Sequence, residues 1–152
     1  MIDVHRATPT EFATALDLIN EYCRWASTLV GIEVKENPIS FRAYLRVGAG
    51  VWLARVDGEY AGCVALRPLA DRPDGCEIKR LYVRERFRST GVATALLAAA
   101  EAYAASAPYA WAYLDTHAAM SAAIRFYERH GYVACERYND NVSTHFFRKR
   151  LT

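Results

Sequence analysis

One turn in the middle of the chain stands between two strongly patterned segments and limits the folds that are open to it. Residues 77–83 have the composition of a strand, residues 94–105 form an alanine- and leucine-rich stretch typical of a helix, and residues 88–93, RSTGVA, connect them. A further strand is predicted over residues 110–115. The order strand, turn, helix, strand predicts a β-loop-α-β unit, so we expect a fold that mixes helices with a sheet.

The same turn has the chemistry of an anion site. A glycine at its fourth position, leading directly into a helix, can aim unpaired backbone N–H groups and the positive end of the helix at a phosphate, and Arg88 adds charge. The chain contains neither G-x-x-x-x-G-K-[ST] nor G-x-G-x-x-G, so Gly91 belongs to neither a P-loop nor a dinucleotide fingerprint. A glycine that only permits a tight turn is the alternative explanation of the local pattern.

Two motifs together resemble the GNAT superfamily of acyl-CoA-dependent N-acetyltransferases. The first is R-x-x-G-x-A at residues 88–93, which follows the strand at 77–83. The second lies in residues 122–132, which fit the pattern A-I-x-x-Y-x-x-x-G-(F/Y). The resemblance covers about residues 51–132. It implies a GNAT-like acyl-CoA N-acyltransferase fold.

The order of the predicted elements agrees with an α+β fold, an α/β three-layer domain with a mixed, mostly antiparallel sheet flanked by helices. A length of 152 residues and a hydrophobic content of 53% suit one compact domain over residues 1–152. The remaining strands are predicted at residues 2–6, 51–56, 60–66, 132–136 and 143–150.

Local signals predict how several of these elements begin and end. Thr8, Pro9 and Glu11 form a capping pattern that starts the first helix. Asp57-Gly58 suits a tight hairpin between the second and third strands, because both central turn residues need positive φ. Residues 67–75 contain two prolines and are predicted to form a loop. Apolar residues between positions 39 and 47 predict a short second helix.

The resemblance also implies how an acetyl-CoA cosubstrate would be held. In the family, the strand before the phosphate turn and the strand after its helix splay apart, and the pantetheine arm lies between them. The backbone is expected to pair with this arm at Leu81, Tyr82 and Val83. The pyrophosphate is expected to bind at Arg88, Ser89, Thr90, Gly91, Val92, Ala93 and Thr94. An ordinary core strand at 81–83 would have the same sequence, so this assignment rests on the resemblance.

Two side chains are candidates for catalysis. Tyr127 is expected to protonate the departing thiolate, because the family uses a tyrosine at this helix position and a phenol is protonated at neutral pH. Glu77 is expected to act as the general base that takes a proton from the amine. His117 and ordered water are the alternatives for the base. Met120 departs from the family pattern, in which an asparagine often occupies this position and helps to hold the cofactor.

The expected activity is that of an acetyl-CoA-dependent N-acetyltransferase. By direct attack, a primary amine of a small molecule or peptide would accept the acetyl group. The alternative is a catalytically silent acyl-CoA-binding regulatory module, which keeps the cofactor turn and uses Tyr127 only for packing. The polar segment at residues 138–141 suits a turn and could contact the acceptor. Trp25 and Trp52 are expected to line the mouth of the site or to fill the core.

Composition argues against several other classes of partner. A formal net charge of +2, without a basic stripe, argues against nucleic acid or a membrane surface. No apolar stretch approaches the roughly 20 residues needed to span a bilayer. The four cysteines form no C-x-x-C pair, the histidines lack metal-ligand spacing, and the first residues lack the features of a signal peptide. We therefore expect no metal and a cytoplasmic location. The sequence leaves open the acceptor and whether the chain forms a homodimer.

Overall fold

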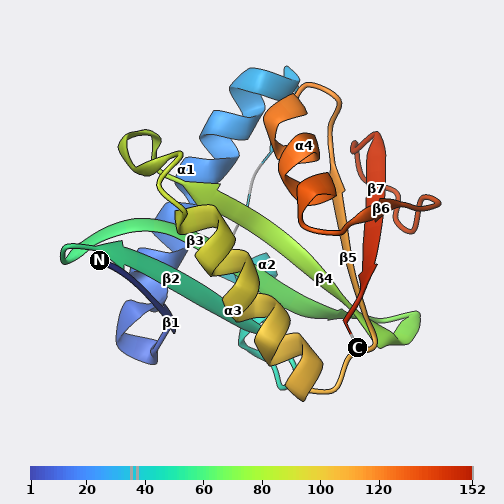
Figure 1. Cartoon of the computed structure of the whole chain (residues 1–152), viewed down its shortest axis with the longest axis horizontal. Coiled ribbons are helices and arrows are strands. Elements are labelled where there is room, and N and C mark those ends of the chain that lie inside the picture. Colours follow the sequence, from blue (N-terminus) through green and yellow to red (C-terminus); the bar gives the residue numbers. More distant parts are fainter. Residues whose placement is uncertain (35, 37, 152) are drawn as a thin grey trace.

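The computed structural model describes residues 1–34, 36 and 38–151, and their centre is one seven-stranded sheet. The strands lie in the order β1-β2-β3-β4-β5-β7-β6 (Figure 1). Only β4 and β5 are parallel, and every other neighbouring pair is antiparallel. The strands are β1 (Ile2–Arg6), β2 (Gly50–Val56), β3 (Glu59–Leu69), β4 (Arg72–Val83), β5 (Trp111–Thr116), β6 (Val133–Ala134) and β7 (His145–Arg150).

Helices cover both faces of the sheet and give the predicted three layers. The helices are α1 (Phe12–Val30), α2 (Pro38–Phe41), α3 (Val92–Ser106) and α4 (Ser121–Arg129). Three 3-10 turns accompany them: η1 (Pro9–Glu11), η2 (Arg42–Leu45) and η3 (Glu85–Phe87). The mixed, mostly antiparallel sheet with flanking helices confirms the fold class.

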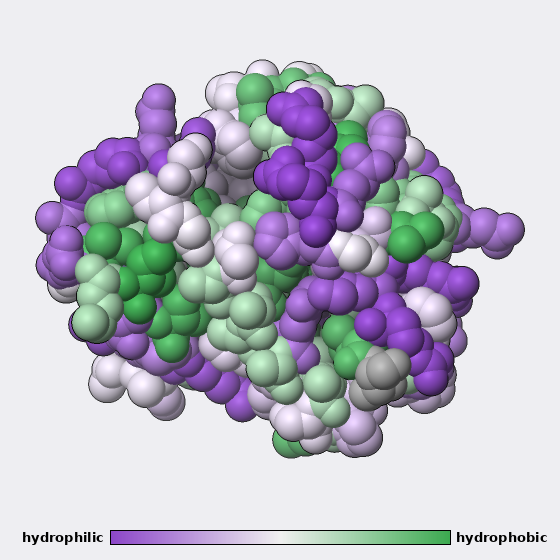
Figure 2. Space-filling model, in the orientation of Figure 1, coloured by the Kyte–Doolittle hydropathy of each residue, from purple (hydrophilic) through white to green (hydrophobic). Residues whose placement is uncertain are grey.

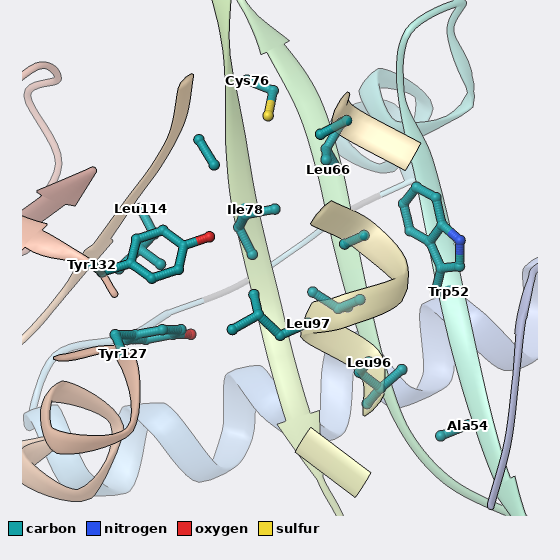
Figure 3. Packing of buried hydrophobic residues seen from close by; sticks show 14 of the residues in the cluster. Trp52, Ala54, Leu66, Cys76, Ile78, Leu96, Leu97, Leu114, Tyr127 and Tyr132 are labelled. Carbon is teal, nitrogen blue, oxygen red and sulfur yellow. The ribbon is translucent and has the colours of Figure 1, made fainter. Parts of the chain in front are cut away.

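Two hydrophobic clusters fix these layers. The larger one joins α3 and α4 to one face of the sheet, and Figure 3 shows Leu97 of α3 beside Ile78 of β4. The smaller one joins α1, α2 and η2 to the opposite face through residues such as Leu18 and Tyr44. We refer to these as the α3 face and the α1 face. A side chain on β4 therefore points toward α3 and α4 or toward α1.

The exposed surfaces of α3 and α4 differ, as their sequences require. Figure 2 shows a strongly hydrophilic surface over α4 and a weakly hydrophobic one over α3. The α4 sequence SAAIRFYER places charged residues opposite its apolar stripe, whereas α3 is rich in alanine. Both helices nevertheless bury residues against the sheet, which is the arrangement expected of surface helices.

Several local predictions are confirmed. The Glu11 carboxylate accepts a hydrogen bond from the Thr8 N–H over 3.1 Å, at the start of the first helical segment. Gly31 ends α1 with a φ of 79°. Asp57 and Gly58 have φ values of 50° and 85° and form the tight turn between β2 and β3. The second helix is shorter than expected, because α2 passes into η2 after Phe41; the side chain of Ile39 lies outside the described residues.

The prediction of a loop over residues 67–75 is wrong. β3 continues to Leu69 and β4 begins at Arg72, so only a tight turn separates them. Pro68 lies opposite Cys76, beyond the last pairing of β3 with β2 at Leu66. The outer side of this part of the hairpin has no neighbouring strand, so the missing N–H of a proline breaks no ladder there. Pro68 therefore marks the part of β3 that lies at an edge of the sheet, and the strand continues through it.

β4 and β5 separate after a short contact, and this separation positions the candidate site. They pair only where residues 75–77 face residues 111–113. Beyond that point the two strands diverge, and α4 lies next to the opening (Figure 1). The backbone of β4 from Ile78 to Val83 thus has β3 on one side, and on the other side no described strand pairs with it. The predicted splay is confirmed.

Candidate active site

One cavity of about 810 Å³ occupies the opening between β4 and β5. Residues of α1, β4, β5 and α4 and the turn before α3 line it. It brings together most of the residues that the sequence singled out: Leu81, Tyr82, Val83, Arg88, Ser89, Gly91, Val92, Ala93, Thr94 and Tyr127. Thr90 and Glu77 are not among its lining residues. The cavity has the size of a small-molecule site.

The turn before α3 presents a row of free backbone donors. Ser89 and Gly91 both have positive φ, at 62° and 91°, and Gly91 is the N-cap of α3 without a side-chain cap. Within the described part of the chain, none of the N–H groups from Ser89 to Thr94 donates a hydrogen bond to the protein. Ala95 is the first residue whose N–H is satisfied, by the Gly91 carbonyl at 3.0 Å. This geometry can bind a phosphate.

Arg88 is held in place at the start of this turn. Its Nε donates to the Val83 carbonyl over 2.9 Å, which ties the turn to the end of β4. Its guanidinium also lies 4.7 Å from the ring centre of Trp25 and 6.0 Å from that of Tyr82. Trp25 therefore lines the cavity, whereas Trp52 is buried in the core on the α3 face. The charge of Arg88 is fixed beside the free N–H groups.

Tyr127 points from α4 toward β4, next to Tyr132 (Figure 3). The two rings meet edge to face, with their centres 5.8 Å apart. The Tyr132 hydroxyl donates to Glu101 over 2.8 Å, but the Tyr127 hydroxyl makes no hydrogen bond within the described residues. Burial raises the pKa of the Tyr127 hydroxyl, so it stays protonated at neutral pH. A buried phenol that borders the cavity and has no protein partner can donate to a ligand.

Glu77 lies behind the wall of the cavity, with 1% of its surface exposed. One carboxylate oxygen accepts from Arg67 Nε at 3.1 Å, and the other accepts from the Tyr138 hydroxyl at 2.7 Å. Lys79 Nζ lies 3.9 Å from Glu77 Oε2. Glu77 could reach an amine in the cavity only through an intermediate such as water.

The other candidates for proton transfer lie at the end of β5. His117 lines the cavity, and its Nδ1 accepts a hydrogen bond from the Ala119 N–H at 3.0 Å. That contact occupies the lone pair of a neutral imidazole whose proton is on Nε2. Met120, the departure from the family pattern, also lines the cavity and precedes α4.

A group of charged residues on the α1 face was not predicted from the sequence. Arg67, Lys79, Arg80 and Asp115 all line the cavity. The segment of residues 138–143, called here the 138–143 segment, wraps over this group and donates several hydrogen bonds to Asp115. Its position explains the polar cluster near the C-terminus. Lys79, Arg80 and Asp115 lie within predicted strands, which was the available signal, whereas Arg67 fell in the predicted loop. Only the paired strands show that these residues meet.

Metal binding and membrane crossing find no support in the described residues. No group of three His, Cys, Asp or Glu side chains among them could hold a metal ion. No described helix combines the length and apolar character needed to cross a membrane.

Comparisons with known proteins agree with this architecture. Residues 15–132 match the model of the acetyltransferase (GNAT) family. An uncharacterised N-acetyltransferase of Schizosaccharomyces pombe is 34% identical over 94 residues, which cover 60% of this chain and 57% of that protein. The matches to curated relatives span only about half of their length, from 42% to 57%.

Solved structures extend the likeness over the whole chain. A GNAT-family acetyltransferase of Staphylococcus aureus has a TM-score of 0.82 at 17% identity, with 100% of both chains covered. The PaiA N-acetyltransferase of Thermoplasma acidophilum, solved in complex with coenzyme A, has a TM-score of 0.72 at 17% identity, with 99% of both chains covered. At these identities the likeness shows a shared fold.

Proposed function

Because the chain belongs to the GNAT acetyltransferase family, we propose that it transfers an acetyl group from acetyl-CoA to a primary amine of a small molecule or peptide. The observation that carries the proposal is one cavity with two features. Within the described protein the N–H groups from Ser89 to Thr94 donate no hydrogen bond, and the Tyr127 hydroxyl has no partner. The first feature suits a phosphate and the second suits a leaving group.

In this proposal the turn before α3 holds the pyrophosphate of acetyl-CoA. Free N–H groups and the positive end of α3 stabilise the negative charge of the pyrophosphate. Arg88 and Arg129 add positive charge to the cavity wall. The pantetheine arm would lie in the opening between β4 and β5, where the backbone from Leu81 to Val83 has no strand partner on that side. An extended arm can occupy this edge as an added strand would.

We assign Tyr127 as the acid that protonates the departing thiolate. Direct attack of the amine on the thioester carbon forms the amide bond and breaks the carbon–sulfur bond, and the sulfur leaves as a thiolate that needs a proton. Tyr127 is protonated at neutral pH and borders the cavity, and its hydroxyl makes no hydrogen bond to the residues that the structure describes. Holding the two reactants in one cavity supplies much of the remaining rate enhancement.

Glu77 is the proposed base and would act through an ordered water. An amine must lose its proton before it can attack, and a carboxylate is a suitable acceptor. The position of Glu77 behind Arg67 and Tyr138 requires the intermediate water. His117 is less suitable, because the Ala119 N–H already uses its Nδ1. To accept a proton at Nε2, neutral His117 would have to carry its own proton on Nδ1, which would break that hydrogen bond.

Product analysis tests the proposal. The purified protein would be incubated with acetyl-CoA and a panel of primary amines, and free thiol and acetylated amine would both be quantified. Equal amounts of the two products, with no acetyl group on the protein itself, would support direct transfer. Binding of acetyl-CoA without turnover of any amine would support the alternative, a silent acyl-CoA-binding module.

A further inference from the structure

Three cationic side chains reach the cavity from the α1 face of the sheet. They are Arg67 of β3 and the consecutive residues Lys79 and Arg80 of β4. Consecutive residues of a regular strand point to opposite faces. Here the pairing of β3 with β4 shifts register between Cys63 and Ala65, and Arg80 has a φ of 59°. This bulge directs Lys79 and Arg80 to the same face.

The packing of the neighbouring residues confirms that the alternation of side chains between the two faces shifts by one residue at the bulge. Ile78 and Leu81 contribute to the core on the α3 face, although they are three residues apart. Tyr82 packs into the core on the α1 face, against α1. The left-handed conformation of Arg80 is unfavourable for a residue with a side chain, so the surrounding structure must maintain it. Its consequence is a second cation in the cavity.

The carboxylates around these cations already accept several hydrogen bonds from the protein. Asp115 accepts from the side chains of Asn139, Asn141 and Ser143 over distances of 2.5, 2.7 and 3.0 Å. The Glu77 carboxylate accepts from Arg67 and Tyr138.

Glu36 completes this set of carboxylates. It accepts from Tyr44 at 3.1 Å and from Arg80 Nε at 3.2 Å. Neutral donors therefore contribute to the hydrogen bonds of all three carboxylates, most of all at Asp115. They can offset the charge of the cations without using all of their N–H groups.

The cations keep donors that the described residues do not use. Lys79 Nζ lies 3.7 Å from Asp115 and 3.9 Å from Glu77, which is too far for a hydrogen bond to either. Arg80 donates only through Nε, so the other four N–H bonds of its guanidinium have no hydrogen-bond partner there. Only 13% of the Lys79 side chain and 16% of the Arg80 side chain are exposed. Partly buried cations with free donors bind anions well.

We propose that the acceptor carries a carboxylate besides its amine, and is thus a free amino acid. Lys79 and Arg80 would bind the carboxylate, with Arg67 adding positive charge, while the amine faces the thioester. This inference rests on the proposed acetyl transfer and narrows its substrate class. A neutral amine or an amide would leave the unused N–H donors of the two partly desolvated cations without an anionic acceptor, and it should be a poor substrate.

Matched acceptors test the inference on the full chain. L-Methionine, L-methioninamide and 3-(methylthio)propylamine share a side chain and differ in the acid group, and L-glutamate and L-lysine with their amides extend the series. Rates would be compared per neutral amine, because the three head groups differ in basicity. We expect kcat/KM for the acid to exceed that for its amide by about tenfold or more.

Variants assign the preference to the proposed residues. Arg80→Gln should raise KM for the amino acid more than it changes kcat. It should also lower the ratio of kcat/KM for the acid to kcat/KM for its amide. Lys79→Met should have the same effects. It provides the test if thermal melting shows that Arg80→Gln does not fold. Arg148→Gln is the matched control, because Arg148 is an exposed cation of β7 that does not line the cavity.

The outcomes separate this inference from the activity on which it rests. Amides or decarboxylated amines that react as well as the acids would overturn the amino-acid assignment and leave acetyl transfer standing. An acid preference that survives both variants would overturn the role of Lys79 and Arg80. Absence of turnover with every acceptor, while acetyl-CoA binds, would overturn the proposed function and the inference with it.

Discussion

The side-chain amide of Asn139 donates to Oδ2 of Asp115 over 2.5 Å and fastens the 138–143 segment to the end of β5. Asn141 donates to the same oxygen at 2.7 Å, and Ser143 donates to Oδ1 at 3.0 Å. Asp115 is thus the anchor that keeps this segment over the charged group on the α1 face. Only 6% of its side chain is exposed.

This anchor should make the stability of the protein depend on acid pH. Burial opposes ionisation of Asp115, but the charge of Lys79 and the hydrogen bonds from the 138–143 segment outweigh it and hold the pKa below its usual value. A carboxyl whose pKa is lowered by folding contributes stability above its unfolded pKa of about 4, and that contribution disappears as the pH falls through the folded pKa. The free energy of unfolding should therefore drop as the pH is lowered below about 4.

Asp115→Asn isolates this contribution. At pH 7 the variant should be less stable by about 1–3 kcal/mol, because an amide cannot accept all of these hydrogen bonds. Its loss of stability between pH 5 and pH 3 should be smaller than that of the wild type. Denaturant titrations across this range provide the comparison. Parallel pH dependences in the two proteins would show that Asp115 is not the titrating anchor.

Gly91→Val should weaken acetyl-CoA binding by about tenfold or more without unfolding the protein. Gly91 has a φ of 91°, which strains any residue with a side chain, and among the described residues other than its chain neighbours only Ile2 lies within 4 Å of an added Cβ, at 3.8 Å. Gly58→Val is the matched control, because Gly58 has a φ of 85° and open space but lies in a hairpin outside the cavity. Calorimetric titration with acetyl-CoA measures the affinity of each variant. An affinity of Gly91→Val equal to that of the wild type would show that the phosphate does not bind at the turn before α3.

Tyr127→Phe should lower the rate by about 100-fold and leave stability nearly unchanged. The hydroxyl makes no hydrogen bond to the described protein, so its removal breaks none, but the proposed proton donor is lost. Tyr132→Phe is the contrast, since its hydroxyl donates to Glu101. That variant should lose about 1 kcal/mol of stability and retain turnover. Equal rates for wild type and Tyr127→Phe, with chemistry rate-limiting, would make Tyr127 a packing residue.

Glu77→Gln should lower kcat/KM at neutral pH and recover part of it at high pH. The glutamine keeps the size of the side chain but cannot take a proton, whereas at high pH the amine loses its proton unaided. Thermal melting would check that the loss of the Arg67 ion pair has not unfolded the variant. A pH profile equal to that of the wild type would exclude Glu77 as the base.

The sequence predicted best where a local rule decides the structure. Positive φ at Asp57 and Gly58 follows from the demands of a two-residue hairpin, and the free N–H groups after Arg88 follow from a helix that begins without a side-chain cap. The apolar stripe that places Tyr127 in the core likewise follows from helical periodicity.

Tertiary context decided what the sequence could not show. Pro68 can lie in a strand because the pairing of β3 with β2 stops at Leu66, so β2 needs no N–H from residue 68. The bulge at Arg80 has no local signature, since an arginine gives no preference for a left-handed conformation. The partners of Asp115 follow it by 24 to 28 residues and meet it only through the pairing of β5 with β7.

The initial rate of CoA release at saturating acetyl-CoA, measured against amine concentration, is the decisive test of acetyl transfer to an amine. Acetyl transfer by direct attack predicts negligible release without an amine and a rate that rises and saturates with the preferred acceptor. The same curve for Tyr127→Phe should reach a plateau about 100-fold lower. A rate that stays at the buffer level for every amine, in protein shown to bind acetyl-CoA, would rule out acetyl transfer and leave an acyl-CoA-binding module.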